Sequence, residues 1–286
     1  MKYIILTLSL FFSFSLSGQH MMLTGDITPR GTGLIVDYPG AAAAYSLRNL
    51  TSLWGGNAVI KVRESGSNTE QDFTATEVTD GTLSTFCGSN DGFVVTWYDQ
   101  SGNGYNAIQS TTSNQPQIVS NGQVIFENGN PALKFDGTDD YFTSIASYNQ
   151  PFTYFVISKS VSISVDKVMI DGSSGLNFVQ LKYYQAVGRF IIFSGSILQG
   201  LALNTNQNLH YALYDGSSSQ IGLNNGAASS GNAGTNSPTG LTIGSRLAGT
   251  GQFWDGNIQE MILYSSDQSA NRSGIESNIN AYYSIY

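Results

Sequence analysis

Short runs that alternate apolar and polar residues recur along most of this chain. In the run AVIKVRE, Val59, Lys61 and Arg63 alternate with Ile60 and Val62. Similar runs follow, bounded by turn residues: GFVVTWYD, PALKFDG, FTYFVISK, KVMIDG, LNFVQLKYY, RFIIFSG, LHYALYDG, LTIGS and FWDGNIQEMILY. The loops between them are too short for crossover helices. The pattern predicts an all-β fold, an antiparallel β-sandwich.

The segment AAAAYSLRNL, residues 41–50, has a different pattern. Alanine and leucine are good helix formers, and Ala44, Leu47 and Leu50 recur at helical spacing. The preceding Pro39 suits the start of a helix. We therefore predict a short N-terminal helix here.

The last residues of the chain predict a second helix. Apolar side chains fall at i, i+4, i+7 and i+8, namely Ile275, Ile279, Tyr282 and Tyr283. Asp267 and Ser269 are the candidate N-cap residues. A C-terminal amphipathic helix is therefore expected to close the domain by docking on the sheet.

The N-terminus, MKYIILTLSLFFSFSLSGQ, has the pattern of a secretory signal peptide. One lysine precedes an apolar run from Ile4 to Leu16, and small residues follow. The run is shorter than the ~20 residues that a membrane span needs, and a buried N-terminal strand is the alternative. We predict a signal peptide at residues 1–18, a connecting segment at 19–40, one domain at 41–286, no membrane span, and a secreted or cell-surface location.

The charge pattern excludes one class of partner. The 286 residues include 12 basic and 20 acidic ones, for a net charge of -8, and the basic residues are scattered singly. Because a phosphate backbone needs a basic patch, nucleic acid is not expected as a partner. Cys87 is the only cysteine, so no internal disulfide can form.

Two acidic loops are candidate calcium sites. In DQSGNG, Asp99, Ser101 and Asn103 alternate, but Ser110 stands where the helix-loop-helix calcium motif needs an acid. A strand-to-strand corner is the favoured interpretation of that loop. FDGTDDYF contains three carboxylates, those of Asp136, Asp139 and Asp140. They repel one another unless a cation, backbone amides or water separates them, which makes calcium a candidate ion. The alternative there is an Asp-Gly turn with solvated acids.

Four segments together carry a resemblance to a known family. They are AAAAYSLRNL with AVIKVRE, then FVVTWYDQSGNGYNAIQ, PALKFDGTDDYF and FWDGNIQEMILY. The chain resembles the catalytic domain of arabinofuranosidase B, of glycoside hydrolase family 54. It is also similar to the wider concanavalin A-like, laminin-G-like jelly rolls. The resemblance spans roughly residues 41–286 and implies a jelly-roll sandwich that serves as a glycosidase, a glycan-binding module or a structural protein.

The resemblance also implies two catalytic carboxylates, and this chain departs from it at both positions. Aligning Phe193-Ser194-Gly195 puts Arg189 at the nucleophile, and aligning Ile243-Gly244-Ser245 puts Arg246 at the acid/base. An arginine stays protonated and can perform neither role. We therefore favour a protein that binds without hydrolysing. The alternatives are an arabinofuranosidase with displaced acids, Asp171 or Asp255, and an assembly protein of a phage or surface filament.

Glycan binding requires aromatic faces together with side chains that read hydroxyl groups. If the strands around 177–193 and 241–254 line the concave sheet, they bring together the candidate contacts Tyr183, Tyr184, Arg189, Arg246 and Trp254. The alternative is that most of these aromatics belong to the core. His210 is expected to be a half-buried strand residue rather than a base. The expected partner is a glycan or a cell-surface polymer.

Overall fold

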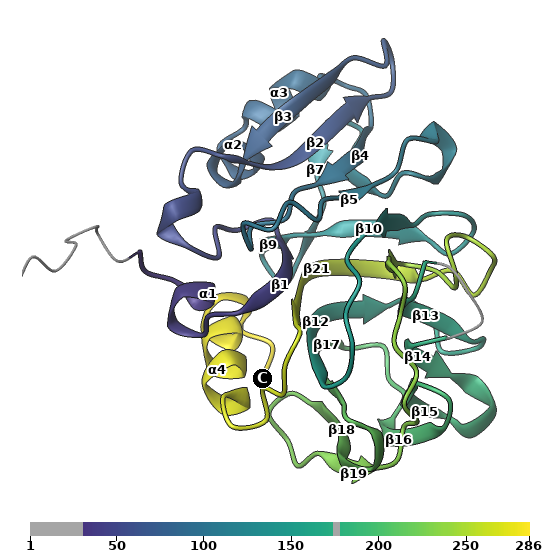
Figure 1. Cartoon of the computed structure of the whole chain (residues 1–286). Coiled ribbons are helices and arrows are strands. Elements are labelled where there is room, and N and C mark those ends of the chain that lie inside the picture. Colours follow the sequence, from purple (N-terminus) through teal and green to yellow (C-terminus); the bar gives the residue numbers. More distant parts are fainter. Residues whose placement is uncertain (1–30, 174–177) are drawn as a thin grey trace, which may run out of the picture. The chain divides into compact units, whose positions relative to one another are not determined.

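Antiparallel β-strands dominate the protein (Figure 1). The computed structural model describes residues 31–173 and 178–286, which belong to one compact unit. The all-β, sandwich-like fold class that the alternation predicted is confirmed. The predicted signal peptide lies outside the described residues, as do residues 19–30 of the connecting segment, so both stay predictions.

The strands form two series of antiparallel pairs. In pairing order the first series is β19 (Ser229–Gly231), β18 (Ser219–Leu223), β17 (Gln207–Tyr214), β12 (Phe152–Ser160), β21 (Asp255–Tyr264), β10 (Leu133–Asp136), β6 (Gln117–Ser120), β4 (Gly92–Trp97), β2 (Ala58–Glu64) and β3 (Glu70–Thr74). The strand β1 (Ala41–Ser46) also pairs with β21, and β7 (Gln123–Val124) pairs with β6.

The second series branches from β4. It runs through β5 (Ala107–Ile108), β11 (Phe142–Ser144), β20 (Leu241–Ile243), β13 (Lys167–Asp171), β14 (Gln180–Tyr184), β15 (Arg189–Phe193) and β16 (Ile197–Ala202). A small hairpin joins β8 (Phe126–Glu127) to β9 (Asn130–Pro131). The helices are α1 (Leu34–Asp37), α2 (Ala75–Thr79), α3 (Thr82–Cys87) and α4 (Arg272–Tyr283), with short 3₁₀ turns η1 (Ser52–Trp54), η2 (Thr112–Asn114), η3 (Gln185–Val187) and η4 (Gly216–Ser218).

The strand β12 separates two hydrophobic clusters. Alternate residues of a strand point to opposite faces. Tyr154 and Val156 therefore join the main core, which residues of both strand series share, whereas Phe155 and Ile157 join a second cluster. That second cluster includes buried residues of α1 and α4. The two helices thus cover the face of β12, β17 and β21 that points away from the main core (Figure 1).

The predicted helix at residues 41–50 is wrong. Ala41–Ser46 forms β1, which pairs with β21 from Ala41 opposite Tyr264 to Ser46 opposite Glu260. Helix propensity is a weak preference, and the ladder with β21 outweighs it here. The short N-terminal helix is instead α1, within the connecting segment.

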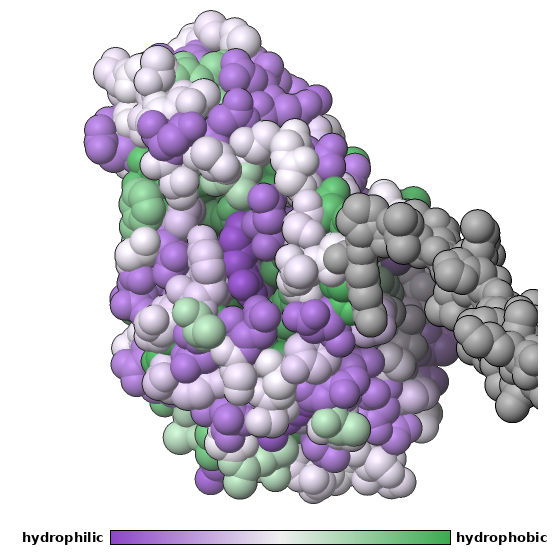
Figure 2. Space-filling model, turned by 90° about the vertical axis from the view of Figure 1, so that its left-hand side faces the viewer, coloured by the Kyte–Doolittle hydropathy of each residue, from purple (hydrophilic) through white to green (hydrophobic). Residues whose placement is uncertain are grey.

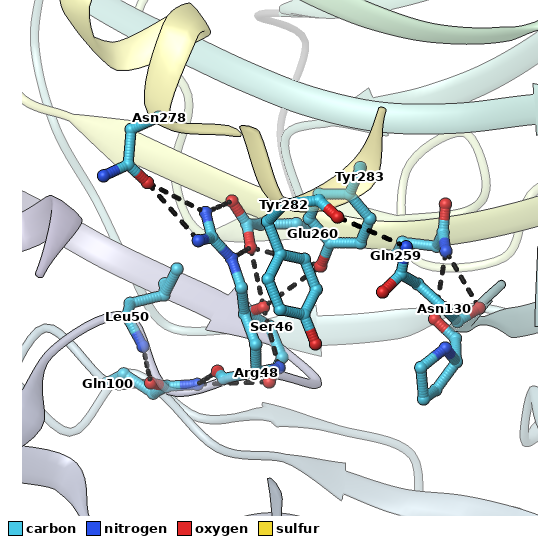
Figure 3. A network of polar contacts seen from close by, with 11 residues as sticks. Ser46, Arg48, Leu50, Gln100, Asn130, Gln259, Glu260, Asn278, Tyr282 and Tyr283 are labelled. Atoms are coloured by element: carbon cyan, nitrogen blue, oxygen red, sulfur yellow. Dashed lines mark hydrogen bonds and ion pairs between the residues drawn. The ribbon is translucent and has the colours of Figure 1, made fainter. Parts of the chain in front are cut away.

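A buried polar network holds the end of β1 against β21 and α4 (Figure 3). The Arg48 guanidinium donates to both carboxylate oxygens of Glu260, at 2.8 and 3.0 Å. Glu260 also accepts hydrogen bonds from the hydroxyls of Ser46 at 2.7 Å and Tyr283 at 3.2 Å. The carboxylate is 1% exposed, so these donors replace the water that it loses on folding.

The C-terminal amphipathic helix is confirmed as α4. Ile275, Ile279 and Tyr283 are buried in the second cluster, whereas Tyr282 is 41% exposed. The predicted caps are wrong, because the helix begins later, with Asn271 at the N-cap position. Asp267 instead accepts a hydrogen bond from the Ser269 backbone amide, in the turn before the helix.

The loop DQSGNG is a strand-to-strand corner, as we favoured. Asp99 is buried and accepts hydrogen bonds from the backbone amides of Ala44, Ser101 and Tyr105. The Asn103 side chain donates to the carbonyls of Ala41 and Ala42. Gly102 and Gly104 have φ of 89° and 75°, which only glycine adopts readily. The Asp99 carboxylate therefore stabilises the corner and also holds it against β1.

Figure 2 shows the face that carries α1 and α4. Hydrophilic residues gather there in a hollowed strip, and hydrophobic residues lie in small separate areas. Within the described residues, none of the helices is long and apolar enough to cross a membrane.

Candidate functional site

A pocket of about 250 Å³ opens on the face of β14 and β15 that points away from the core. We call it the Arg246 pocket, and it is lined by Phe178, Gln180, Lys182, Tyr184, Ile191, Phe193, Ile197, Arg246 and Gln252. Among the described residues, this lining includes aromatic and aliphatic groups, amides and two cations but no carboxylate.

Strand register explains which side chains reach the pocket. In β14, Gln180, Lys182 and Tyr184 lie on one face, and their partners in β15 are Phe193, Ile191 and Arg189. The intervening Leu181 and Tyr183 are 0% exposed and belong to the main core. One face of this hairpin therefore builds the pocket while the other completes the core.

The two cations of the pocket are each held against an aromatic ring. The Arg246 guanidinium lies 4.6 Å from the ring centre of Phe178, and the Lys182 ammonium lies 4.5 Å from that of Tyr184. Lys182 also approaches Asp166, with 3.6 Å between nitrogen and oxygen. Cation–π contacts of this kind restrain a long side chain while leaving its charge in place.

The structure brings together only some of the five predicted glycan contacts. Tyr184 and Arg246 share the pocket. Arg189 lies across from Tyr184 at the exposed end of the hairpin, where its guanidinium donates to the Gly200 carbonyl, and it does not line the pocket. Tyr183 and Trp254 are fully buried, with ring centres 4.9 Å apart. Their assignment as glycan contacts is therefore corrected, because neither ring reaches solvent.

The loop after β20 positions Arg246. Its backbone amide donates to the Gly251 carbonyl at 2.9 Å, and its carbonyl accepts from the amides of Gly249 and Thr250. Leu247, Ala248 and Gln252, all in this loop, have φ between 35° and 51°. Residues other than glycine rarely adopt this conformation, and such strain concentrates at functional sites.

The sequence interpretation missed most of the lining. The missed residues are Phe178, Gln180, Lys182, Ile191, Phe193, Ile197 and Gln252. Period-2 spacing from Tyr184 would have identified Gln180 and Lys182. No comparable sequence signal marks Gln252, which comes from the loop after β20.

A second pocket, of about 440 Å³, adjoins the first at Gln252, which lines both. We call it the Asp255 pocket, since Asp255 lines it together with Asp136 and Asp166. Asp255 forms an ion pair with Lys167 at 2.8 Å.

Asp171, the other displaced acid proposed from the sequence, lines neither pocket. It is 0% exposed, and its carboxylate accepts from the Gly172 and Val179 amides and from the Gln180 side chain. Burial raises its pKa, although these hydrogen bonds oppose the shift. The structure therefore gives Asp171 a supporting position behind Gln180.

The aspartates of FDGTDDYF lie close together. One carboxylate oxygen from each of Asp136, Asp139 and Asp140 falls within 4.8 Å of the others. The loop is also an Asp-Gly turn, in which Gly137 has φ of 77° and Asp136 accepts from the Thr138 amide. Burial, followed by the Asp136 charge, raises the pKa of Asp140 to about 7. Both interpretations of this loop are thus compatible with its geometry, and calcium binding stays a prediction.

Calcium should raise the melting temperature if the three aspartates bind it, because a cation relieves their mutual repulsion. We expect a saturable increase of a few degrees in the parent protein and none in Asp140→Asn. Asp91→Asn, which changes an acid outside the cluster, is the control and should respond like the parent. Differential scanning fluorimetry with calcium and with chelator measures the effect. Identical curves for parent and Asp140→Asn would contradict the prediction.

The fold is similar to that of arabinofuranosidases. No protein-family model matches the sequence, and no curated protein matches it. A family 54 α-L-arabinofuranosidase soaked with a cyclic sulfate inhibitor has a TM-score of 0.65 and 14% identity, over 87% of this chain and 64% of that one. An arabinofuranosidase complexed with arabinofuranosyl-α-1,2-xylobiose gives 0.62 and 14%, over 84% and 62%. This chain therefore spans less than two thirds of the length of those enzymes, and the likeness shows a shared fold.

Proposed function

We propose that this protein binds a glycan in the Arg246 pocket without hydrolysing it. The composition of the lining carries the proposal, since aromatic and aliphatic side chains, two amides and two cations suit the apolar faces and hydroxyls of a sugar. Retaining hydrolysis would need two carboxylates about 5 Å apart, and the described lining holds none. The arabinofuranosidase-like fold supports a glycan as the ligand class.

Hydrolysis of arabinofuranosides is the second candidate function. The structural neighbours favour it over simple binding, because they are themselves arabinofuranosidases. In this chain its support is the Asp255 pocket, where three carboxylates lie beside the Arg246 pocket. A hydrolase of this type would use Asp255 with Asp136 or Asp166.

The proposal includes secretion or attachment to the cell surface, where glycans are accessible. Its support is the N-terminal sequence, with its apolar run followed by small residues.

Binding without turnover is tested with arabinan, other plant and bacterial polysaccharides, and 4-nitrophenyl α-L-arabinofuranoside. We expect affinity for at least one glycan and no release of nitrophenol. Tyr184→Ala should weaken binding about tenfold, the equivalent of about 1.4 kcal/mol. Phe126→Ala, which removes a 51% exposed aromatic outside the pocket, should leave affinity unchanged.

Turnover that a single Asp255→Asn substitution abolishes would establish the hydrolase and overturn the proposal of simple binding. Equal affinities of Tyr184→Ala and the parent would show that glycan binds elsewhere.

A further inference from the structure

We propose that the Arg246 pocket selects a sugar that carries a carboxylate, as in the uronic acid units of a polysaccharide. This inference rests on the proposed glycan-binding function and adds the class of sugar. Two cations line a pocket whose described lining contains no carboxylate, and each cation is restrained by a neighbouring ring.

Arg246 supplies the stronger of the two contacts. It takes part in none of the ion pairs found among residues 31–173 and 178–286. Backbone hydrogen bonds with Gly251 and Thr250 fix the main chain of Arg246. The Phe178 ring beneath the guanidinium restrains the side chain. A guanidinium presents a planar fork of donors that matches the two oxygens of a carboxylate. Arg246 is therefore placed to bind a carboxylate with two parallel hydrogen bonds.

Two of the three aromatic rings of the pocket, those of Phe178 and Tyr184, favour charge recognition over sugar stacking. Phe178 and Tyr184 each have one face occupied by a cation, so that face cannot stack on the apolar side of a neutral sugar. Occupied in this way, the rings position positive charge at the pocket wall. A neutral sugar would gain little from that charge, whereas a carboxylate gains an ionic hydrogen bond.

Among the described residues, a nearby acid pairs with Lys182 but not with Arg246. Asp166 is the ion-pair partner of Lys182, at 3.6 Å, and leaves Arg246 unpaired within the described residues. Asp171 lies behind Gln180, which donates to it at 2.8 Å.

The Gln252 side-chain oxygen is buried without a hydrogen-bond partner among the described residues and can accept from a sugar hydroxyl. The volume of about 250 Å³ is below that of pockets for drug-sized ligands, roughly 300–1,000 Å³, and suits one sugar ring.

Isothermal titration calorimetry of the full chain with trigalacturonate and with its fully methyl-esterified form tests the inference. The methyl ester removes the negative charge of each carboxyl group and adds one methyl group to it. We expect trigalacturonate to bind at least tenfold more tightly, with an affinity that falls as salt is added. Arg246→Met should remove the preference, Arg246→Lys should keep part of it, and Lys182→Met should reduce it. Lys61→Met, on β2 outside the pocket, should change nothing.

Equal or tighter binding of the methyl ester would overturn the carboxylate preference while leaving glycan binding intact. A preference that survives in both Arg246→Met and Lys182→Met would also overturn it. Failure to bind either ligand, together with failure to bind any neutral polysaccharide, would overturn the proposed function as well. Thermal unfolding of each variant shows that it is folded, and Lys182→Met provides the second test if Arg246→Met is not.

Discussion

Replacing Arg48 with methionine is expected to lower the free energy of unfolding by about 3–5 kcal/mol. The substitution keeps most of the apolar volume of the side chain but removes the guanidinium that contacts both oxygens of Glu260. Glu260 is 1% exposed, so its charge would stay buried with only the Ser46 and Tyr283 hydroxyls as donors. Because this network joins β1, β21 and α4, its loss should weaken the docking of the C-terminal helix (Figure 3). Urea unfolding followed by circular dichroism measures the change.

Two further variants separate the buried ion pair from a general effect of losing a cation. Lys159→Met removes the partner of Glu127 in a pair whose side chains are 39% and 17% exposed. Such a pair contributes at most about 1 kcal/mol, so this variant should remain close to the parent. The double variant Arg48→Met/Glu260→Gln should be more stable than Arg48→Met, because it no longer buries an unpaired charge. A loss of under 1 kcal/mol in Arg48→Met would contradict the role given to the network.

Acidification is expected to destabilise the protein in part through His210. The imidazole is 1% exposed and contacts the Ser158 hydroxyl at 3.0 Å and the Phe190 ring. Burial lowers its pKa to about 3, whereas the unfolded chain takes up this proton near pH 6.5. Between these values the unfolded state binds more protons, so the free energy of unfolding falls as the pH falls from 6.5 towards 3. Above pH 6.5 this contribution is constant.

The variant His210→Gln isolates this contribution. At about 1.4 kcal/mol per pH unit, the parent should lose about 2–3 kcal/mol more than the variant between pH 7 and pH 4.5. Urea unfolding at both pH values gives the loss in free energy of unfolding for each protein. The contributions of all other titratable groups cancel in the comparison, because parent and variant share them. Parallel losses in parent and variant would show that His210 titrates normally in the folded state. The sequence interpretation expected a half-buried histidine, and the structure places it in the core.

Alternation along the strands predicted much of the fold, because period-2 spacing is a local property of the sequence. The C-terminal helix was predictable for the same reason, from the spacing of Ile275 and Ile279. The corner at Asp99 was also predictable, since glycine and aspartate encode turns locally. The residue at which a helix begins is less predictable. The N-cap is Asn271, whereas the sequence had suggested Asp267 or Ser269.

The candidate site was only partly predictable. Arg246 and Tyr184 were identified from the sequence, and the structure places both in one pocket. Tyr183 and Tyr184 are neighbours in a strand and so cannot both face the same side. The sequence does not say which side is the core, and the packing of Tyr183 against Trp254 decides it.

By itself, the sequence determined the all-β class, the single cysteine, the acidic charge and the closing helix, because these follow from composition and from contacts between near neighbours. Only the tertiary structure decided that Ala41–Ser46 is a strand, since β21 and Glu260 are more than 200 positions away. It also decided the composition of the Arg246 pocket, which joins β14, β15 and β16 to the loop after β20. Long-range pairing and burial outweigh local preference at these places, and no local pattern records them.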